Sequence, residues 1–395
     1  MPKTITIAII LFLSVGFGFA QPLNKIKGTV TDQSTKEPIS YAGISIEGTF
    51  TGAPSDLSGN FEFEVPPTNT GTYLIVSAVG YQTVRIAISE IFKELFKVEM
   101  IPTSYEIGNV DVIAGSVEMQ RILKNVILHI DSNYIKGAYS QKLYFKGNST
   151  INKDPRRVDE AIFDYSDSKG YQRESVLDAY QHRNYIFLGI RRNFEVKNLA
   201  DGLNPIDDLL NLDIVRVKGN ILDISYLSNY DLKLDRQGLF EGDSVWVINY
   251  RLRKPDLSKT GDFYATSYQG KLTVSKSSYA VLKNETLVKA SDYNTLGRAF
   301  ANAGDRKFLP TSIGYEFSTI YRKVKTGYNL AYLKYNRYHF WKNKTTGEAK
   351  TESFVNYLIP LELNTPNQTA VKGRTYYSEM AFDKKFWEGF ELKVE

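Results

Sequence analysis

A short stretch near the N-terminus, SDLSGNFEFEVP, carries oxygen-bearing side chains at alternate positions. Asp56, Ser58 and Asn60 have the spacing of the first ligands in a calcium-binding loop, where oxygen atoms alternate along the chain. An EF-type loop also needs glycine at its sixth position and glutamate at its twelfth. Counting from Asp56, the glycine is fourth and the twelfth residue is Pro67. We therefore predict a turn between strands, with Asp56 accepting hydrogen bonds from backbone amides and Gly59 at positive φ.

The chain has only three histidines, which restricts the catalytic chemistry that it can support. His129, His182 and His339 each lack a glutamate three residues later, and no His-Glu-x-x-His motif occurs, so no zinc peptidase site is predicted. Cysteine, a Gly-x-Ser-x-Gly elbow and a Gly-Lys-Ser/Thr phosphate loop are also absent from the sequence. We accordingly predict no catalytic residue, no metal and no cofactor, and a hydrolase is the least favoured alternative.

An aromatic cluster in YLKYNRYHFW is a better candidate for ligand contact. On a strand, alternate residues share a face, so Tyr335, Arg337, His339 and Trp341 are predicted to lie together. Exposed tyrosine and tryptophan rings can stack on sugar rings while arginine donates hydrogen bonds. The alternative is a strand with one core face and one solvated face, because such rings bury their bodies and keep their polar tips wet. Both interpretations stay open at this point.

Composition favours a β-rich protein that does not bind nucleic acid. The 395 residues include 27 Tyr and 22 Phe but only 4 Met, and aromatic residues favour strands. The net charge is only +5, and the basic residues are scattered rather than gathered in the stripe that nucleic-acid binding requires. A chain of this length is expected to form two domains.

The N-terminus has the pattern of a secretory signal peptide. A lysine is followed by the apolar run ITIAIILFLSVGF and then by the small residues Gly18 and Ala20. The run is shorter than the roughly 20 residues that a spanning helix needs. We therefore predict a signal peptide at 1–20 and an exported protein, without disulfides because cysteine is absent.

From Lys25 onward, apolar and polar residues alternate with period two. In KIKGTVTD, Ile26, Gly28 and Val30 face one way, and in NFEFEVP the apolar side chains face inward and the glutamates outward. About five such runs recur at a spacing of about ten residues, joined by Gly, Pro and Asp turns. This pattern predicts an antiparallel β-sandwich at 21–101.

Several features of this region occur in a recognisable order: Gly28-Thr29-Val30, Pro38 followed by Ala42-Gly43, Asp56-x-x-Gly59-x-Phe61, Pro66 and Val79-Gly80-Tyr81. Over residues 25 to about 100 they resemble the carboxypeptidase-regulatory-like domain. The resemblance implies a transthyretin-like (prealbumin-like) β-sandwich, which is an accessory domain and not a peptidase, and which is widespread in envelope proteins of two-membrane bacteria.

A connector is predicted at 102–115, where EIGNVDVIAG resembles the stretch that follows this sandwich in TonB-dependent receptors. The next segment, SVEMQRILKNVILHIDSNY, has apolar residues at helical spacing, so we predict a helix with Ser116 as its N-cap. A complete receptor is disfavoured because the remaining 280 or so residues are too few for a plug and a 22-stranded barrel at ~9–11 residues per strand.

The rest of the chain is again rich in predicted strands, so 116–395 is expected to be one helix plus a larger antiparallel β domain, in one version a curved half-barrel. Its order of segments resembles an uncharacterised envelope family that carries the regulatory-like sandwich in front of a β-rich domain. The pairing of GDSVWVINY with GKLTVSKSSYAVLKNE is similar to the half-open sheets of lipoprotein-carrier proteins.

These observations predict a non-catalytic cell-envelope protein that acts as an interaction or binding module for a protein or a glycan. It would work in the periplasm or at the outer-membrane periphery of a two-membrane bacterium, with peripheral association with that membrane. The alternative is a carrier that holds a lipid or another apolar ligand in its curved sheet.

Overall fold

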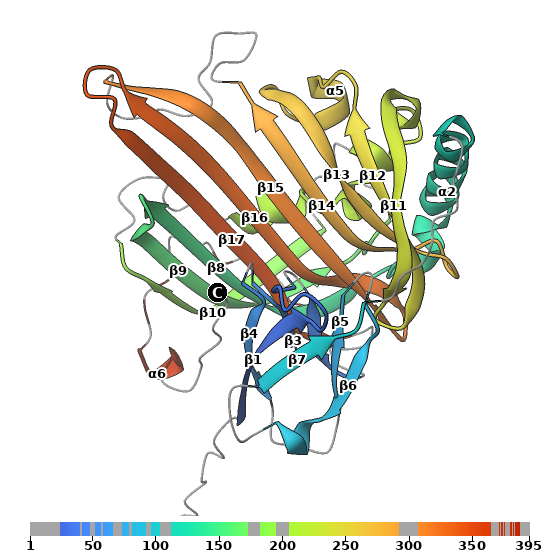
Figure 1. Ribbon diagram of the computed structural model, residues 1–395. Helices are drawn as coiled ribbons and strands as arrows, with labels where there is room; N and C mark the ends of the chain where they lie inside the picture. The colour runs from blue at the N-terminus through green and yellow to red at the C-terminus, as the bar shows by residue number, and fades with distance from the viewer. Residues whose placement is uncertain are drawn as a thin grey trace, which may run out of the picture.

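The computed structural model describes residues 24–39, 42–47, 52–56, 58–65, 73–78, 81–91, 96–102, 112–172, 182–194, 205–291 and 307–364, and isolated positions between 371 and 387. They form two units, one drawn in blue and cyan and a larger one drawn from green to red in Figure 1. The predicted signal peptide at 1–20 and residues 103–111 of the predicted connector lie outside the described residues.

The small unit consists of two sheets that share one core. One sheet has the strand order β4 (Asn60–Val65), β1 (Asn24–Asp32), β7 (Phe96–Met100). The other has the order β3 (Gly52–Pro54), β2 (Gly43–Ile46), β5 (Tyr73–Ser77), β6 (Val84–Ala87), and the 3-10 turn η2 (Ile88–Glu90) follows. Alternate apolar residues such as Ile26 and Val30 are fully buried in this core. The period-two pattern therefore identified the inward face.

One pairing in this unit differs from the antiparallel prediction, because β1 and β7 run parallel. β7 follows a strand of the other sheet, so the chain crosses between the sheets before it pairs, and such a crossover permits a parallel neighbour where a hairpin does not. Gly28 of β1 is needed for close packing here. A Cβ at this position would lie 2.6 Å from the Phe61 ring and 2.4 Å from the carbonyl oxygen of Phe96.

The large unit is dominated by one open sheet of ten antiparallel strands, which Figure 1 shows curving around the helices. The strand order is β10 (Arg183–Arg192), β9 (Asp154–Asp167), β8 (Tyr139–Ile151), β17 (Ala349–Asn364), β16 (Gly327–Asn343), β15 (Phe308–Val324), β14 (Val281–Ala290), β13 (Ala265–Ser275), β12 (Asp243–Leu252), β11 (Tyr230–Phe240). A mainly β fold, with a small sandwich before a larger antiparallel domain, is thereby confirmed.

The strand order requires one long crossing. β10 and β11 are consecutive in sequence but form opposite edges of the sheet, about 43 Å apart if the sheet were flat. The connection between them contains α3 (Pro205–Leu210), α4 (Ile214–Val217), η5 (Asn220–Leu222) and η6 (Leu227–Asn229). Most of the described apolar residues from 205 to 229 are buried in the same core as the sheet, so this crossing segment covers one face of the sheet.

The helix α2 (Val112–Asn133) lies against β11 and β16. Its buried residues follow the predicted helical spacing: Met119, Ile122, Leu123, Val126 and Ile130. The helix begins four residues before Ser116, so Ser116 is not its N-cap as predicted. Residues 112–116 include no proline, so the backbone there can already be helical.

Two short helices complete the large unit. α5 (Leu257–Thr260) joins β12 to β13, and α6 (Lys384–Trp387) lies against the edge strand β10. The ring of Phe386 occupies the space where a side chain at Gly189 would be, because a Cβ there would lie 2.1 Å from the ring. Trp387 is 7% exposed, and the Arg191 guanidinium lies 4.6 Å from the centre of its ring. Among the described residues, no helix has the length and apolar character needed to cross a membrane.

Candidate functional site

The four predicted contact residues lie on the helix-covered face of β16. Tyr335 pairs with the core residue Phe317, and alternate residues of a strand share a face. His339 and Trp341 are each only 3% exposed, and the Arg337 guanidinium lies 4.7 Å from the centre of the Phe354 ring. The strip is therefore largely enclosed and does not form an open platform. Ligand contact by Tyr335, Arg337, His339 and Trp341 stays a prediction.

The polar ends of this strip are joined to one carboxylate. The Trp341 indole donates to Glu352 Oε2 at 3.4 Å, and His339 Nδ1 lies 3.6 Å from the same oxygen. Burial lowers the pKa of His339, and the charge of Arg337 acts in the same direction. The imidazole is therefore neutral at neutral pH. The contacts among His339, Trp341 and Glu352 are consistent with a structural role.

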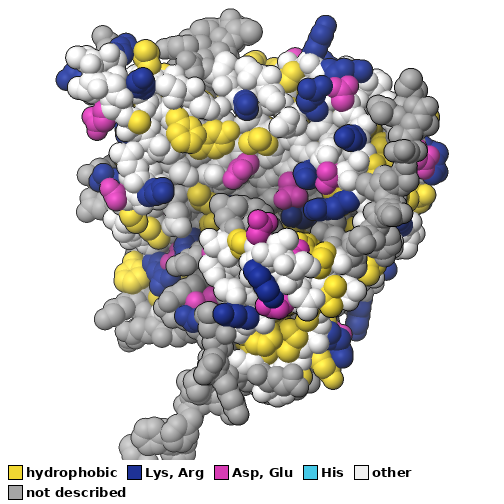
Figure 2. Space-filling view, viewed as in Figure 1, with side chains coloured by type: hydrophobic (Ala, Val, Ile, Leu, Met, Phe, Trp, Pro, Cys, Tyr) yellow, Lys and Arg dark blue, Asp and Glu magenta, His cyan; other side chains and the backbone are white. Residues whose placement is uncertain are grey.

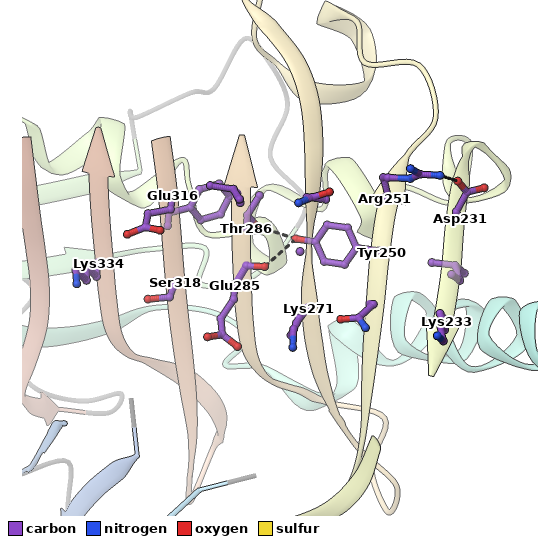
Figure 3. A pocket seen from close by; sticks show the side chains of 16 residues that line it. Asp231, Lys233, Tyr250, Arg251, Lys271, Glu285, Thr286, Glu316, Ser318 and Lys334 are labelled. Atoms are coloured by element: carbon purple, nitrogen blue, oxygen red, sulfur yellow. Dashed lines mark hydrogen bonds and ion pairs between the residues drawn. The ribbon is translucent and has the colours of Figure 1, made fainter. Parts of the chain in front are cut away.

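The opposite face of the sheet contains a cavity of ≈ 560 Å³, which we call the outer-face pocket (Figure 3). Its first row of side chains comes from six adjacent strands, one from each of β11 to β16, and the register places each beside the next. In order across the sheet, these are Lys233, Asn249, Lys271, Glu285, Ser318 and Lys334.

A second row lies two residues further along each strand and therefore on the same face. It consists of Asp231, Arg251, Gln269, Leu287 and Glu316. The floor between the rows is the sheet itself. Beneath it, the Tyr250 ring crosses Gly270, where a Cβ would lie 2.4 Å from the hydroxyl oxygen, and this hydroxyl is 2.7 Å from Thr286 Oγ1. Glycine at position 270 thus lets a buried tyrosine support the pocket from the core side.

The acidic groups of the outer-face pocket already have partners. Arg251 donates to Asp231 at 2.9 Å, Lys283 lies 3.0 Å from Glu285, and Asn336 donates to Glu316 at 3.2 Å. Two of the lysines, Lys233 and Lys271, make fewer contacts. Lys271 makes one long contact with Asp235, at 3.4 Å, and Lys233 has no ion pair or hydrogen bond among the described residues.

Lys334 is the most enclosed cation of the outer-face pocket. Burial lowers its pKa, whereas the nearby carboxylates of Glu316 and Asp56 act in the opposite direction. Because Asp56 belongs to the small unit, the sandwich lies beside this end of the pocket. Figure 2 shows Lys/Arg and Asp/Glu side chains mixed on this face of the sheet, just above the sandwich.

The turn that holds Asp56 is the stretch with calcium-like spacing. Asp56 Oδ1 accepts from the amides of Ser58 and Asn60 at 2.8 and 2.7 Å, and Gly59 has φ of 76°. These contacts are those of the predicted turn. Within the described part of the chain, no three His, Asp or Glu side chains are grouped so that they could hold a metal ion.

The core contains a charged network that sequence reasoning missed. Arg216 of α4 donates to Asp167 at 2.6 Å and to the Tyr139 hydroxyl at 2.6 Å. Asp213 accepts from the Tyr321 hydroxyl at 2.5 Å and also caps α4 through the Arg216 amide. Arg216, Asp167 and Asp213 are at most 2% exposed. The network ties the crossing segment to the sheet, and its enclosure favours a structural role.

The histidines do not come together into a catalytic site. His129 is exposed on α2, His182 precedes β10, and His339 is on β16. His182 Nε2 lies 3.8 Å from Asp167, but the neighbouring Ser168 hydroxyl donates to the His182 carbonyl oxygen and not to its ring. A serine–histidine relay is therefore not assembled here.

The small unit is a carboxypeptidase-regulatory-like domain. Residues 26–112 match the family model described as CarboxypepD_reg-like domain. The TonB-dependent receptor SusC of Bacteroides thetaiotaomicron is 35% identical over 79 residues, which are 20% of this chain and 7% of the receptor. The chain thus spans only a small part of the length of this curated relative.

Solved structures similar to this chain have low sequence identity and low TM-scores. A DUF1329 family protein from Desulfovibrio piger is 11% identical with a TM-score of 0.26, over 65% of this chain and 95% of that one. A LolA superfamily protein from Nitrosomonas europaea is 10% identical with a TM-score of 0.23, over 63% and 94%. A protein from Bacteroides fragilis, described as membrane-associated and of unknown function, is 9% identical with a TM-score of 0.16, over 86% and 98%.

Proposed function

We propose that this protein is a non-catalytic binding module of the bacterial cell envelope, and that its ligand occupies the outer-face pocket. The observation that carries the proposal is the pocket itself. Its volume of ≈ 560 Å³ is within the usual range of ligand sites, and charged, amide and hydroxyl side chains from six strands converge on it. The regulatory-like domain at its side is compatible with a binding role.

Between the two ligand classes predicted from the sequence, a protein segment fits this pocket better than a glycan. A sugar platform needs exposed aromatic rings, whereas the two aromatic residues of the pocket, Tyr250 and Phe317, are 2% and 5% exposed. The polar groups instead include amides and hydroxyls, which can bond a peptide backbone: Asn249, Gln269 and Ser318.

The carrier alternative has less support in the described residues. The space between the helices and the sheet, where a carrier would hold an apolar ligand, contains a continuous cluster of buried side chains. The charged network around Arg216 lies in the same region. An apolar ligand placed beside it could not form hydrogen bonds with these buried charged groups, which is unfavourable.

A periplasmic or outer-membrane location is part of this proposal. It is supported by the signal-like N-terminus and by the match to a protein named as a TonB-dependent receptor. The partner would then be another envelope protein.

The test is native mass spectrometry of the purified protein with a panel of short peptides and a panel of envelope glycan fragments. We expect the wild type to retain peptides and the Leu287→Trp variant, whose larger side chain fills the pocket, to lose them. Lys342→Glu, on the same face of β16 but outside the pocket, is the control and should behave as the wild type. Retention that is equal in wild type and Leu287→Trp, or no retention from either panel, would refute the proposal.

A further inference from the structure

We infer that one end of the large unit binds the surface of a membrane that contains anionic phospholipids. We call this end the basic tip. It comprises residues 151–157 around the β8–β9 hairpin, 307–309 at the start of β15 and 338–352 around the β16–β17 hairpin. None of these residues lines the outer-face pocket, so the inference goes beyond the proposed function and can fail without it.

The three segments of the basic tip are neighbours in the sheet. Leu309 of β15 pairs with Lys342 of β16, and Lys342 pairs in turn with Ala349 of β17. The Thr351 amide donates to Asn152 Oδ1 at 2.8 Å, which joins the β16–β17 hairpin to the β8–β9 hairpin. Figure 1 shows the β16–β17 hairpin at the upper left corner of the molecule, away from the sandwich. The basic tip is therefore one continuous surface at an end of the sheet.

Charge is the first argument for an anionic partner. The basic tip has seven basic and three acidic residues, a net charge of +4, whereas the whole chain has +5. Only Lys350 is joined to a carboxylate of the tip by an ion pair among the described residues, at 2.6 Å from Glu352. Within the same part of the chain, four exposed cations of the tip have no ion pair: Lys153, Arg156, Lys342 and Lys344. The exposed carboxylates of the tip are half as many: Asp154 and Glu348. The surface therefore attracts anions.

Exposed apolar side chains are the second argument. Phe340 is 42% exposed and Leu309 is 50% exposed. Phe340 and Lys342 are alternate residues of β16, and Leu309 pairs with Lys342, so all three share the outer face of the sheet. The Tyr338 ring lies 5.6 Å from the Phe340 ring and crosses Gly314, where a Cβ would lie 2.6 Å from the tyrosine oxygen. Figure 2 shows apolar side chains exposed beside Lys and Arg at the upper left of this face.

The combination favours a membrane over a soluble anion. Each lysine or arginine near an anionic membrane surface adds to the attraction. Phe340 and Leu309 can enter the boundary between headgroups and acyl chains, while the lysine stems lie along it and keep their charged ends at the phosphates. A soluble anion would contact the charges but would leave the apolar side chains in water.

The first experiment measures co-sedimentation of the mature protein, without the predicted signal peptide at 1–20, with two kinds of vesicle. One is made of equal parts of phosphatidylcholine and phosphatidylglycerol, and the other of phosphatidylcholine alone. We expect binding to the anionic vesicles to be at least tenfold stronger, with an advantage that shrinks in high salt. Lys342→Gln and Lys344→Gln should each weaken it about fivefold. The control Lys97→Gln changes an exposed lysine on β7 of the sandwich and should leave binding unchanged.

A second experiment locates the residues that enter the membrane. Phe340→Trp places an indole at the exposed position of the tip, and Ile101→Trp places one on the sandwich, where Ile101 is 43% exposed. Relative to the wild type, vesicles with brominated acyl chains should quench the added emission of Phe340→Trp and not that of Ile101→Trp. Phe340→Ser should weaken binding to anionic vesicles several-fold, with an unchanged circular dichroism spectrum.

Four results would overturn this inference. Binding to neither vesicle, or equal binding to both at every salt concentration, would leave a protein partner as the candidate for this surface. Equal losses from Lys342→Gln and Lys97→Gln would mean general charge attraction without a defined surface. Quenching of Ile101→Trp but not of Phe340→Trp would place the contact elsewhere. Displacement by glycerol phosphate at the same phosphate concentration would assign the tip to a free phosphate. Failure of the proposed function is distinct, because Lys342→Glu should retain peptides as the wild type does and should lose vesicle binding.

Discussion

At the scale of single residues, Arg216 is a fully buried charge at the centre of the polar network in the large unit's core. It satisfies Asp167 and orients α4 where water cannot reach, and it lies near a second buried carboxylate, Asp213. Removing the guanidinium would leave these carboxylates without compensation, which costs far more than the loss of an exposed ion pair.

We therefore expect Arg216→Met to reduce the free energy of unfolding by about 3–5 kcal/mol, measured by urea denaturation. Arg121→Met is the matched control, because Arg121 forms an exposed pair with Glu118 on α2 and its loss should change the free energy of unfolding far less. Equal effects of the two substitutions would show that the buried network does not stabilise the fold.

The buried His339 predicts a dependence of stability on pH. Its pKa in the folded protein lies below the ordinary value of 6.5, so as the pH falls the unfolded chain takes up this proton first. Above a pH of about 6.5, His339 is neutral in both states and does not lower the free energy of unfolding. As the pH falls from about 6.5 toward the pKa of the folded state, the free energy of unfolding decreases. His339→Gln should reduce the loss of stability between pH 7 and pH 5. His129→Gln, at an exposed position on α2, should leave that loss unchanged, and the idea fails if both variants follow the wild type.

At the scale of elements, the short helix α6 depends on a glycine in the strand that it covers. Gly189→Ala would place a methyl group 2.1 Å from the Phe386 ring, so the ring must move and its neighbour Trp387 with it. We expect the tryptophan emission to shift to longer wavelength as Trp387 becomes exposed.

Two controls make this prediction specific. Gly219→Ala should have little effect, since a Cβ there meets only Val217, at 3.5 Å. In a Trp387→Phe background, Gly189→Ala should produce no spectral shift. A shift that persists without Trp387 would mean that the substitution disturbs the sheet and not the helix.

The elements also show what could be read from the sequence and what could not. Alternation along β16 correctly groups Tyr335 with Trp341, because the side-chain period of a strand is local. Which face of β16 is buried depends on where the crossing segment lies, and that segment is joined to the sheet by contacts between residues far apart in the chain, such as Arg216 and Tyr139. The outer-face pocket was missed for a similar reason, since it exists only through the register of six strands.

At the scale of the whole molecule, the two units have separate cores. In the part of the chain that the structure describes, no buried residue belongs to both clusters, so we expect two unfolding transitions instead of one. All three tryptophans, Trp246, Trp341 and Trp387, are in the large unit, so their fluorescence reports on that unit alone, whereas circular dichroism reports on both.

Core truncations can assign the transitions. Ile44→Ala in the sandwich and Leu272→Ala in the ten-stranded sheet each remove a fully buried side chain, at a cost of about 2–5 kcal/mol. Ile44→Ala should move only the transition that tryptophan fluorescence does not see, and Leu272→Ala only the one that it does. If either truncation moves both transitions equally, the units unfold as one.

The pairing of β17 with β8 has a consequence for circular permutation of the ten-stranded sheet. Ser140 near the start of the sheet's first strand pairs with Asn364 at the end of its last, so the points where the chain enters and leaves the sheet are neighbours. A short linker could join these two strand ends, and new termini could be opened at an exposed hairpin such as Thr346–Gly347, between β16 and β17, without breaking a strand pair. For the ten strands, leaving aside α2 and α6, the order in space therefore does not depend on which strand comes first in the polypeptide.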